Sequence, residues 1–366
     1  MVHSTMQLKD LTLKHMRIYE EVSLTLHPRL NVFTGNNAQG KTTVLESIYM
    51  LSYTRSHRTT SDKEIIQQAK PFAKVTGTTT NQSYELVMSP AGKTVKLNGG
   101  SVDKLSAFVG DLSVVMFAPE DLDLLKGPPK LRRQFLNMQG THQDRSLMGE
   151  LSRYQTLLKD RNHRIKQVST LEALKNDGLF QILTQRLAYS AETIMMKRKQ
   201  FLTQLSTRLT PIYQSIANDG LTPTIQYVPS MNFYDYAEQL RDSIDRDFHT
   251  KTTNLGIHRD DFVINHITED FTLHASQGQM RTLAIALKLA LVAWMKEFKK
   301  VIPLVLLDDV FSELDANRQN ALLTHLDAET QVFITTTDLN LIKRENLENY
   351  SHFSINQGKV QVSTYE

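Results

Sequence analysis

The chain has 366 residues, of which 40% are hydrophobic and 22% are charged, and its formal net charge is +3. These values are typical of a folded protein of two or three lobes and exclude a disordered or fibrous one. The absence of cysteine excludes disulfides and zinc–thiolate sites and indicates a cytoplasmic protein, and no stretch approaches the roughly 20 apolar residues of a membrane span, so no membrane partner is expected.

The chain begins with alternating segments that predict strands at residues 6–13 and 22–26, and residues 30–34 form a short apolar run. From residue 41 onward, apolar residues recur at helical spacing. The glycine-rich segment 35–42 therefore lies between a predicted strand and the first turn of a predicted helix.

Residues 35–42 satisfy the pattern G-x-x-x-x-G-K-[ST]. In such a loop, backbone N–H groups close around phosphates at a helix N-terminus, Lys41 neutralises the β- and γ-phosphates, and the Thr42 hydroxyl is offered to Mg²⁺. A glycine turn that merely caps a helix is the alternative. The predicted ATP-binding residues are Gly35, Asn36, Asn37, Ala38, Gln39, Gly40, Lys41, Thr42 and Thr43.

The following segment favours an antiparallel layer. Strands are predicted at residues 72–76, 84–88, 94–97 and 114–117, with the turn Asn98-Gly99-Gly100 among them. The segment Gly127-Pro128-Pro129 then breaks the chain.

A helical pattern extends from this break to about Leu209 and is expected to end at Pro211. It indicates an inserted helical domain over residues 128–250, which leaves residues 1–127 and 251–366 for the nucleotide-binding domain. The other elements expected before the chain returns to that domain are a strand at 224–228, a helix near 234–248 and strands at 262–267 and 271–274.

The helical insertion is rich in basic side chains, which suit contacts to a phosphate backbone without sequence readout. Intervening acids dilute the pattern, and a solvated helix face explains it equally well. The residues are Arg132, Arg133, Arg145, Arg153, Lys159, Arg161, Arg164 and Lys166.

Residues 304–307 read as a buried strand that ends in Asp308 and Asp309. Two carboxylates at the end of such a strand favour a cation site. Asp308 is predicted to hold Mg²⁺, together with Thr42, and Asp309 to orient or deprotonate the water that attacks the γ-phosphate. The alternative is an acidic turn that caps the next segment.

The segment Ser276-Gln277-Gly278-Gln279 opens a long predicted helix. Ser276 and Gln279 have the spacing of a capping box, which would satisfy backbone donors without any ligand. Alternatively, these four residues bind the γ-phosphate of a nucleotide held by another subunit, because a helix N-terminus attracts anions. Local chemistry does not decide between the two.

Several motifs occur together in one order: GNNAQGKT, FAPEDL, GIHRDDF, ASQGQMRTLAIALKLA, LLDDVFSELD and FITTTD. The chain thereby resembles the RecF family of bacterial recombinational-repair ATPases, which is related to SMC proteins. The resemblance implies an α/β fold: a P-loop head of the ABC/SMC type, with a mixed sheet and an antiparallel β layer, plus the inserted helical domain.

In that family two heads sandwich ATP, and each subunit's S-x-G-Q segment completes the other's site. The resemblance implies an ATP-dependent homodimer that clamps DNA at gaps and single-strand/double-strand junctions. It also implies slow hydrolysis involving Lys41, Asp308 and Asp309, and partnership with RecO and RecR in loading RecA. An SMC-like structural or end-bridging protein and an ABC transport motor are the alternatives.

By the same resemblance, residues 312–315 are the D-loop at the dimer seam, and Thr337 lies near the switch position. Asp309 stands where transporter ATPases commonly carry Glu. Residues 117–121 fall roughly where those proteins place a glutamine lid loop, but the glutamine is missing, and Glu120 is the candidate γ-phosphate sensor. His258 precedes two acids in what we interpret as a charged turn. The basic segment 55–58 is left open between a solvated loop and a contact to nucleotide or DNA.

Overall fold

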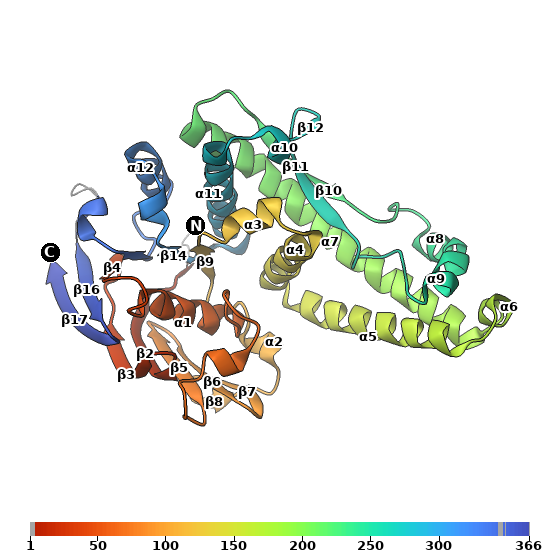
Figure 1. The fold of residues 1–366 in the computed structure, drawn as a ribbon, viewed down its shortest axis with the longest axis horizontal. Coiled ribbons are helices and arrows are strands. Elements are labelled where there is room, and N and C mark those ends of the chain that lie inside the picture. The colour runs from red at the N-terminus through yellow and green to blue at the C-terminus, as the bar shows by residue number, and fades with distance from the viewer. Residues whose placement is uncertain (1–3, 343–346, 348, 366) are drawn as a thin grey trace. The chain divides into compact units, whose positions relative to one another are not determined.

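The computed structural model describes residues 4–365 except 343–346 and 348. It divides into two compact units (Figure 1). We call them the head, Met1–Leu122, Pro211–Gly220 and Ser276–Glu366, and the helical unit, Asp123–Thr210 and Leu221–Ala275.

The head contains a mixed six-stranded sheet in the order β17-β16-β4-β15-β14-β9. All neighbours are parallel except β16 and β17. The three central strands are buried along their whole length, which explains their continuous apolar sequences. The strands are β4 (Leu30–Thr34), β9 (Val114–Phe117), β14 (Leu304–Asp308), β15 (Val332–Thr336), β16 (Tyr350–Asn356) and β17 (Lys359–Tyr365).

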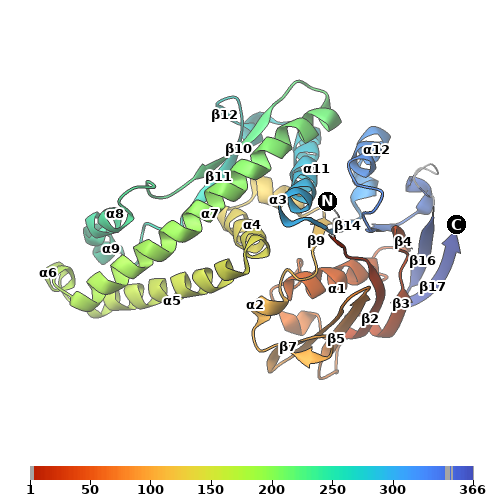
Figure 2. The same cartoon turned by 180° about the vertical axis from the view of Figure 1, so that it is seen from behind.

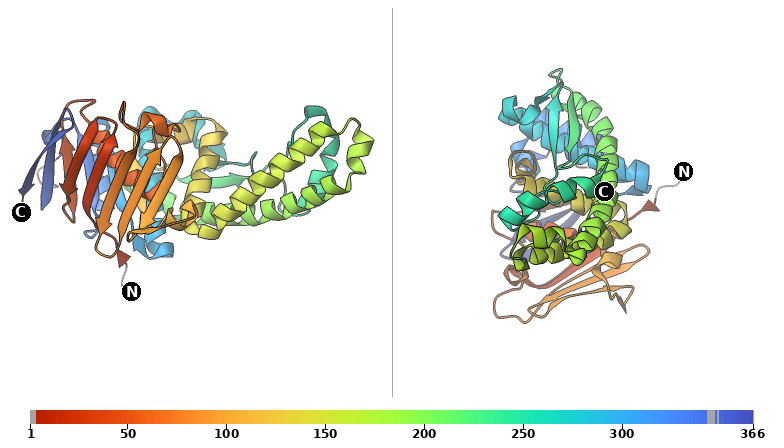
Figure 3. Two further views of the ribbon diagram at one scale, coloured as in Figure 1. Left: turned by 90° about the horizontal axis from the view of Figure 1, so that it is seen from below. Right: turned by 90° about the vertical axis from the view of Figure 1, so that its right-hand side faces the viewer.

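A second, antiparallel sheet has the order β3-β2-β5-β6-β7-β8 (Figure 3). Its side chains alternate between buried and partly exposed positions, as in β6, because one face packs inward. The strands are β2 (Leu8–Met16), β3 (Tyr19–Thr25), β5 (Ala73–Thr79), β6 (Ser83–Ser89), β7 (Gly92–Leu97) and β8 (Gly100–Ser101). The expectation that residues 114–117 join this layer is wrong, because they form β9 and pair in parallel with β14 in the mixed sheet.

Helix α1 (Lys41–Tyr53) packs against strands of both sheets (Figure 2). Of its 13 residues, 12 are buried. A helix covered on all sides can use only its ends for contact with solvent or ligands. Its N-terminus continues directly from the glycine-rich loop.

The head also contains the long helix α11 (Gln277–Trp294), which has the expected position, and several shorter elements. No helix in the described residues is long and apolar enough to span a membrane. The remaining elements are β1 (Ser4–Thr5), β13 (Val301–Ile302), α2 (Leu105–Phe108), η1 (Asp62–Glu64), η2 (Met295–Lys299), η3 (Val310–Glu313), α12 (Ala316–Thr324) and η4 (Leu339–Leu341).

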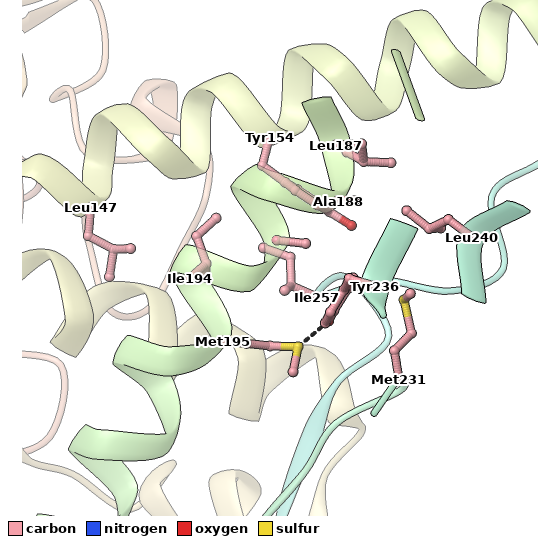
Figure 4. Packing of buried hydrophobic residues seen from close by; sticks show 11 residues of the cluster. Leu147, Tyr154, Leu187, Ala188, Ile194, Met195, Met231, Tyr236, Leu240 and Ile257 are labelled. Atoms are coloured by element: carbon pink, nitrogen blue, oxygen red, sulfur yellow. Dashed lines mark hydrogen bonds between the residues drawn. The ribbon is translucent and has the colours of Figure 1, made fainter. Parts of the chain in front are cut away.

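The helical unit is built around an antiparallel pair of long helices, α5 and α7. Its core packs Leu147 and Tyr154 of α5 against Ile194 and Met195 of α7 (Figure 4). Its elements are α4 (Pro129–Gln143), α5 (Arg145–Gln167), α6 (Leu171–Lys175), α7 (Gly178–Ala217), β10 (Pro223–Val228), α8 (Tyr236–Asp242), α9 (Ile244–Thr250), β11 (Asp261–His266), β12 (Glu269–Asp270) and α10 (Phe271–His274), while α3 (Asp121–Lys126) crosses the boundary from the head.

Two elements differ from expectation. Helix α7 does not end at Pro211 but continues to Ala217. Leu209 and Tyr213 are fully buried on either side of the proline, and this packing compensates for the one backbone hydrogen bond that proline removes. Residues 271–274 form a helix, not a strand, because the Asp270 carboxylate accepts hydrogen bonds from the backbone and hydroxyl of Thr272 and caps the turn.

The division into units also differs from the single insertion proposed at 128–250. Residues after 250 stay with the helical unit because β11 pairs with β10 along its whole length. The end of α7, in contrast, belongs to the head. A strand pairing between distant segments is not visible in local sequence patterns, which is why the boundaries differ.

One of the candidate DNA contacts, Arg161, is excluded by its burial. The Arg161 side chain is fully buried, and its guanidinium donates to Asp247 at 2.8 Å, to Thr253 at 2.7 Å and to Thr184 at 3.0 Å. It also lies 4.7 Å from the centre of the Phe180 ring. A charge so completely enclosed and paired stabilises the helical unit and has no surface for a phosphate.

Removing this buried partner should unfold the helical unit more easily. We expect Arg161→Ala to lower the free energy of unfolding by about 3–5 kcal/mol, because the Asp247 carboxylate is left buried without its counter-charge. Arg153→Ala, at an exposed position of α5, is the control and should change it by less than about 0.5 kcal/mol. Equal effects of the two variants in urea unfolding would contradict this interpretation.

Candidate nucleotide-binding site

The loop 35–40 joins β4 to α1 in a conformation that requires glycine at both ends. Gly35 has φ 149° and Gly40 has φ 110°. A Cβ atom on Gly35 would lie 2.3 Å from the backbone oxygen of Ile355, closer than any real contact. The backbone therefore makes the tight approach that a phosphate-binding loop needs.

Lys41, the first residue of α1, is almost fully buried, with 4% of its surface exposed. Its ammonium donates to the carbonyl oxygens of Gly35 at 2.7 Å and Asn36 at 3.1 Å. The positive charge is thus held inside the curve of the loop, where it can pair with phosphate oxygens. On the other side, Gln39 accepts a hydrogen bond from the backbone of Gln357 at 2.6 Å, which fixes the loop against the β16–β17 turn.

The carboxyl ends of β4, β15 and β14 meet beside this loop, and Asp308 lies at that edge. Its Oδ1 accepts hydrogen bonds from the hydroxyls of Thr42 at 3.0 Å and Thr335 at 2.7 Å. Burial raises the pKa of Asp308 to about 6, although the two hydroxyls oppose the shift, and the charges of Asp309 and Glu120 add to it. A cation at this edge would relieve the cost of the buried carboxylate.

Asp309 follows in a left-handed conformation, with φ 50°. Its backbone N–H donates to Thr335 Oγ1 at 2.9 Å. Its Oδ1 atom is buried and has no hydrogen-bond partner among the residues that the structure describes. An oxygen left without a donor in this position fits a site for Mg²⁺ or for a water molecule.

Residues 276–279 form the first turn of α11, and the capping box is present. Gln279 N donates to Ser276 Oγ at 3.2 Å, and Ser276 N donates to Gln279 Oε1 at 2.8 Å. In the described part of the chain this turn is bonded to Asp219 and not to the phosphate loop. Ser276 and Gln277 are exposed, so the turn remains available to a second molecule.

Comparison with known proteins bears on this site. The RecF/RecN/SMC N-terminal domain model matches residues 7–361. The DNA replication and repair protein RecF of Staphylococcus haemolyticus is 37% identical to the chain over 370 residues, which cover 97% of the chain and 100% of the relative. RecF of Halalkalibacterium halodurans is 38% identical, with coverages of 97% and 99%.

The chain belongs to the RecF family.

Solved structures agree. The structure of the recombination mediator protein RecF with ATP in the RecFOR pathway has a TM-score of 0.89 at 29% identity and covers 99% of this chain and 98% of that one. The Smc head domain with an extended coiled coil from Pyrococcus furiosus has a TM-score of 0.57 at 13% identity, with coverages of 99% and 96%, which shows a shared fold. The predicted fold, a head of the SMC type with a helical insert, is confirmed.

Other residues singled out from the RecF-like motifs have local roles. Ser312 donates to the backbone oxygen of Asp309 at 2.6 Å, and Asp315 caps α12 through the backbone of Arg318. Thr337 and Glu120 are exposed. These positions do not conflict with roles at the nucleotide, and for all four residues such roles stay predictions.

His258 agrees with the interpretation as part of a structural turn. Its Nδ1 lies 2.8 Å from the Tyr154 hydroxyl and its Nε2 lies 3.0 Å from the Thr253 carbonyl oxygen. Burial lowers its pKa. The ring therefore joins α5 to the segment before β11 inside the helical unit.

Thr335 was not selected as a site residue from the sequence. Its hydroxyl donates a hydrogen bond to the Asp308 carboxylate and accepts one from the backbone N–H of Asp309. Thr335 therefore fixes the position of the segment that contains the two aspartates. Threonine is common in strands, and only the register of β14 and β15, which sets Asp308 opposite Thr335, gives it this role. The family resemblance singled out the exposed Thr337, whereas the buried Thr335 makes the hydrogen bonds to the two aspartates.

The pKa of Asp308 should make stability depend on pH. Because the folded pKa is about 6 and the ordinary value is 3.8, the folded protein binds this proton more tightly than the unfolded chain. The free energy of unfolding should therefore fall by about 2 kcal/mol as pH rises from about 4 to about 6. Asp308→Asn should remove this decrease and be more stable than the parent at pH 8 in Mg²⁺-free buffer. The matched control is Asp103→Asn at an exposed position, which should keep it; an identical pH profile for Asp308→Asn would contradict the assignment.

Proposed function

We propose that the chain is an ATP-dependent DNA-binding protein of recombinational repair. ATP joins two heads around DNA at a single-strand gap or junction, and slow hydrolysis releases it. The observation that carries this proposal is the set of Lys41, Thr42 and Asp308, which gathers a buried cation, a hydroxyl and a carboxylate at one loop.

The residues present fit Mg²⁺-ATP. Backbone N–H groups of the loop and the Lys41 ammonium bind the phosphates, and Thr42 and Asp308 hold Mg²⁺. When bound, Mg²⁺ neutralises charge on the phosphate oxygens. Asp309 orients the attacking water and accepts its proton, because its carboxylate has an oxygen without an internal donor. The likeness to a RecF structure with ATP supports ATP as the nucleotide.

A single copy supplies only part of the site in this proposal. The first turn of α11, in which Ser276 and Gln277 are exposed and Gly278 and Gln279 are half-buried, binds the γ-phosphate on the opposite head. Binding at a helix N-terminus does not conflict with the capping box, because the box uses the N–H groups of Ser276 and Gln279 and leaves others for phosphate. ATP is then part of the dimer interface.

Blocking hydrolysis should trap that dimer. We expect Asp309→Asn to bind ATP and to lower the hydrolysis rate by at least about 100-fold, because the amide cannot accept the proton. Light scattering with ATP and Mg²⁺ should then give twice the monomer mass. Lys41→Ala, which loses the phosphate cation, should stay monomeric. A monomeric Asp309→Asn with ATP bound would disprove the clamp.

The DNA-binding surface includes the exposed cations of α5 in this proposal. Arg145, Arg153, Lys159 and Lys166 are exposed. The other four basic residues named for this role are less exposed: Arg161 is buried, and Arg132, Arg133 and Arg164 donate to the Asp261 carboxylate, the Asp260 backbone oxygen and the Asp177 carboxylate. Contacts to the phosphate backbone from α5 suit a protein that recognises DNA structure and not sequence.

Reversing two of these charges should weaken DNA binding uniformly. We expect Lys159→Glu with Lys166→Glu to weaken binding to gapped DNA and to reduce the slope of log K against log salt by about 2. The control reverses the exposed head lysines Lys104 and Lys359. Fluorescence anisotropy across a salt series with and without ATP measures both; equal losses in the two variants would remove α5 from the interface.

Partnership with RecO and RecR in loading RecA is also part of the proposal. It is supported by the likeness to a recombination mediator of the RecFOR pathway that covers 99% of this chain. Mixing the chain with each protein and measuring complex formation by sedimentation tests it. Absence of binding with ATP and gapped DNA present would count against it.

A further inference from the structure

The turn between β2 and β3 forms the outer wall of the phosphate loop. The Tyr19 hydroxyl donates to the carbonyl oxygen of Gly40 at 3.1 Å. A Cβ atom on Gly40 would lie 2.7 Å from both Ile18 Cδ1 and the Tyr19 hydroxyl oxygen. The turn therefore leaves no room for the last glycine of the loop to move outward.

The end of β2 and the turn that follows it hold a conformation that costs free energy. His15 has φ 51° and Arg17 has φ 50°, in the left-handed region that residues with a side chain rarely adopt. Such residues persist where their surroundings fix them, and they gather at functional sites. The surroundings here include hydrogen bonds from Arg17 N to Ile65 O and from Gln67 N to His15 O, both 2.8 Å.

An ion pair between the partly exposed Arg17 and the buried Glu46 adds to these restraints. Arg17 binds Glu46 with two hydrogen bonds, Nε to Oε2 at 2.5 Å and Nη2 to Oε1 at 2.7 Å. Glu46 is fully buried in α1, one helical turn beyond Thr42. Burial alone would raise the pKa of Glu46, but the hydrogen bonds from Arg17 and Ser56 lower it below its usual value, so the carboxylate stays charged.

The contacts form a closed ring of connections. Gly40 directly precedes α1, and α1 contains Glu46, which binds Arg17. Arg17 lies in the turn before Tyr19, and the Tyr19 hydroxyl in turn donates to Gly40. The two parallel hydrogen bonds of this pair fix the position of the turn relative to α1, in addition to any contribution to stability.

We infer that Arg17 and Glu46 are positioning residues for nucleotide binding, which hold the phosphate loop in its binding conformation through Tyr19. This inference rests on the proposed ATP binding. A loop already in its bound conformation loses less entropy when phosphates bind, so the pair increases affinity. It acts on ATP and ADP alike. It leaves the turnover of bound ATP unchanged, because Asp309 is held separately by Thr335.

The test compares substitutions within this ring, using the full chain. Arg17→Lys keeps the charge and loses the paired hydrogen bonds, Glu46→Gln keeps the shape and loses the charge, and Tyr19→Phe removes only the hydroxyl on Gly40. The matched control is Ser56→Ala, because Ser56 donates to the same carboxylate and, among the described residues, its hydroxyl bonds to no residue of the turn. Titration with fluorescent ATP and ADP analogues and steady-state hydrolysis are measured for each variant.

We expect Arg17→Lys and Glu46→Gln each to raise the Kd of both nucleotides and the KM for ATP about 10-fold, with kcat within about twofold. The double variant should be little worse than either single one, because both remove the same interaction. Tyr19→Phe should raise Kd about threefold, and Ser56→Ala should leave it unchanged. Measurements are made where urea unfolding shows each variant to be folded.

Unchanged Kd values in Arg17→Lys and Tyr19→Phe would overturn the inference and leave the pair as a stabilising contact only. A fall in kcat at constant Kd would also overturn it. If the unsubstituted chain binds no nucleotide, the proposed function itself fails. Lys41→Ala, which loses the phosphate cation, distinguishes the cases because it must lose binding in any protein that uses this loop.

Discussion

The burial of α1 between two sheets is the constraint on which the head depends. A helix covered on every side exposes no polar face, so each charge that it carries needs a partner inside the protein. Lys41 finds carbonyl oxygens of the loop, and Glu46 finds Arg17. The open end of the helix is its N-terminus, where the first N–H groups of any α-helix lack intrahelical partners, and this is where a phosphate can bind.

The same logic applies at the carboxyl edge of the mixed sheet. Asp308 is buried, and hydroxyls of Thr42 and Thr335 satisfy one of its oxygens without supplying a positive charge. The pKa of Asp308 is raised because burial disfavours the charged carboxylate more than the two hydroxyls favour it. The buried Asp308 carboxylate thus lowers the stability of the fold at a position where a cation can bind. Binding sites commonly contain groups that destabilise the unoccupied protein in this way.

Burial also divides the basic residues of the helical unit into two groups. Arg161 and its partners fix the packing of long helices, where a charge without a partner would be very costly. Exposed cations such as Lys159 and Lys166 share the same sequence pattern and remain available to an anionic partner. The sequence shows the charges, and only the packing shows which of them face solvent.

The sequence alone determined the phosphate loop, the strand that ends in Asp308 and Asp309, the capped start of α11 and the family, because each depends on residues close together in the chain. The tertiary structure decided the parallel pairing of β9, the continuation of α7 through Pro211, and the roles of Thr335, Arg17 and Glu46. These depend on contacts between segments far apart in the sequence, such as Arg17 and Glu46, which are 29 positions apart, and local periodicity carries no information about such contacts.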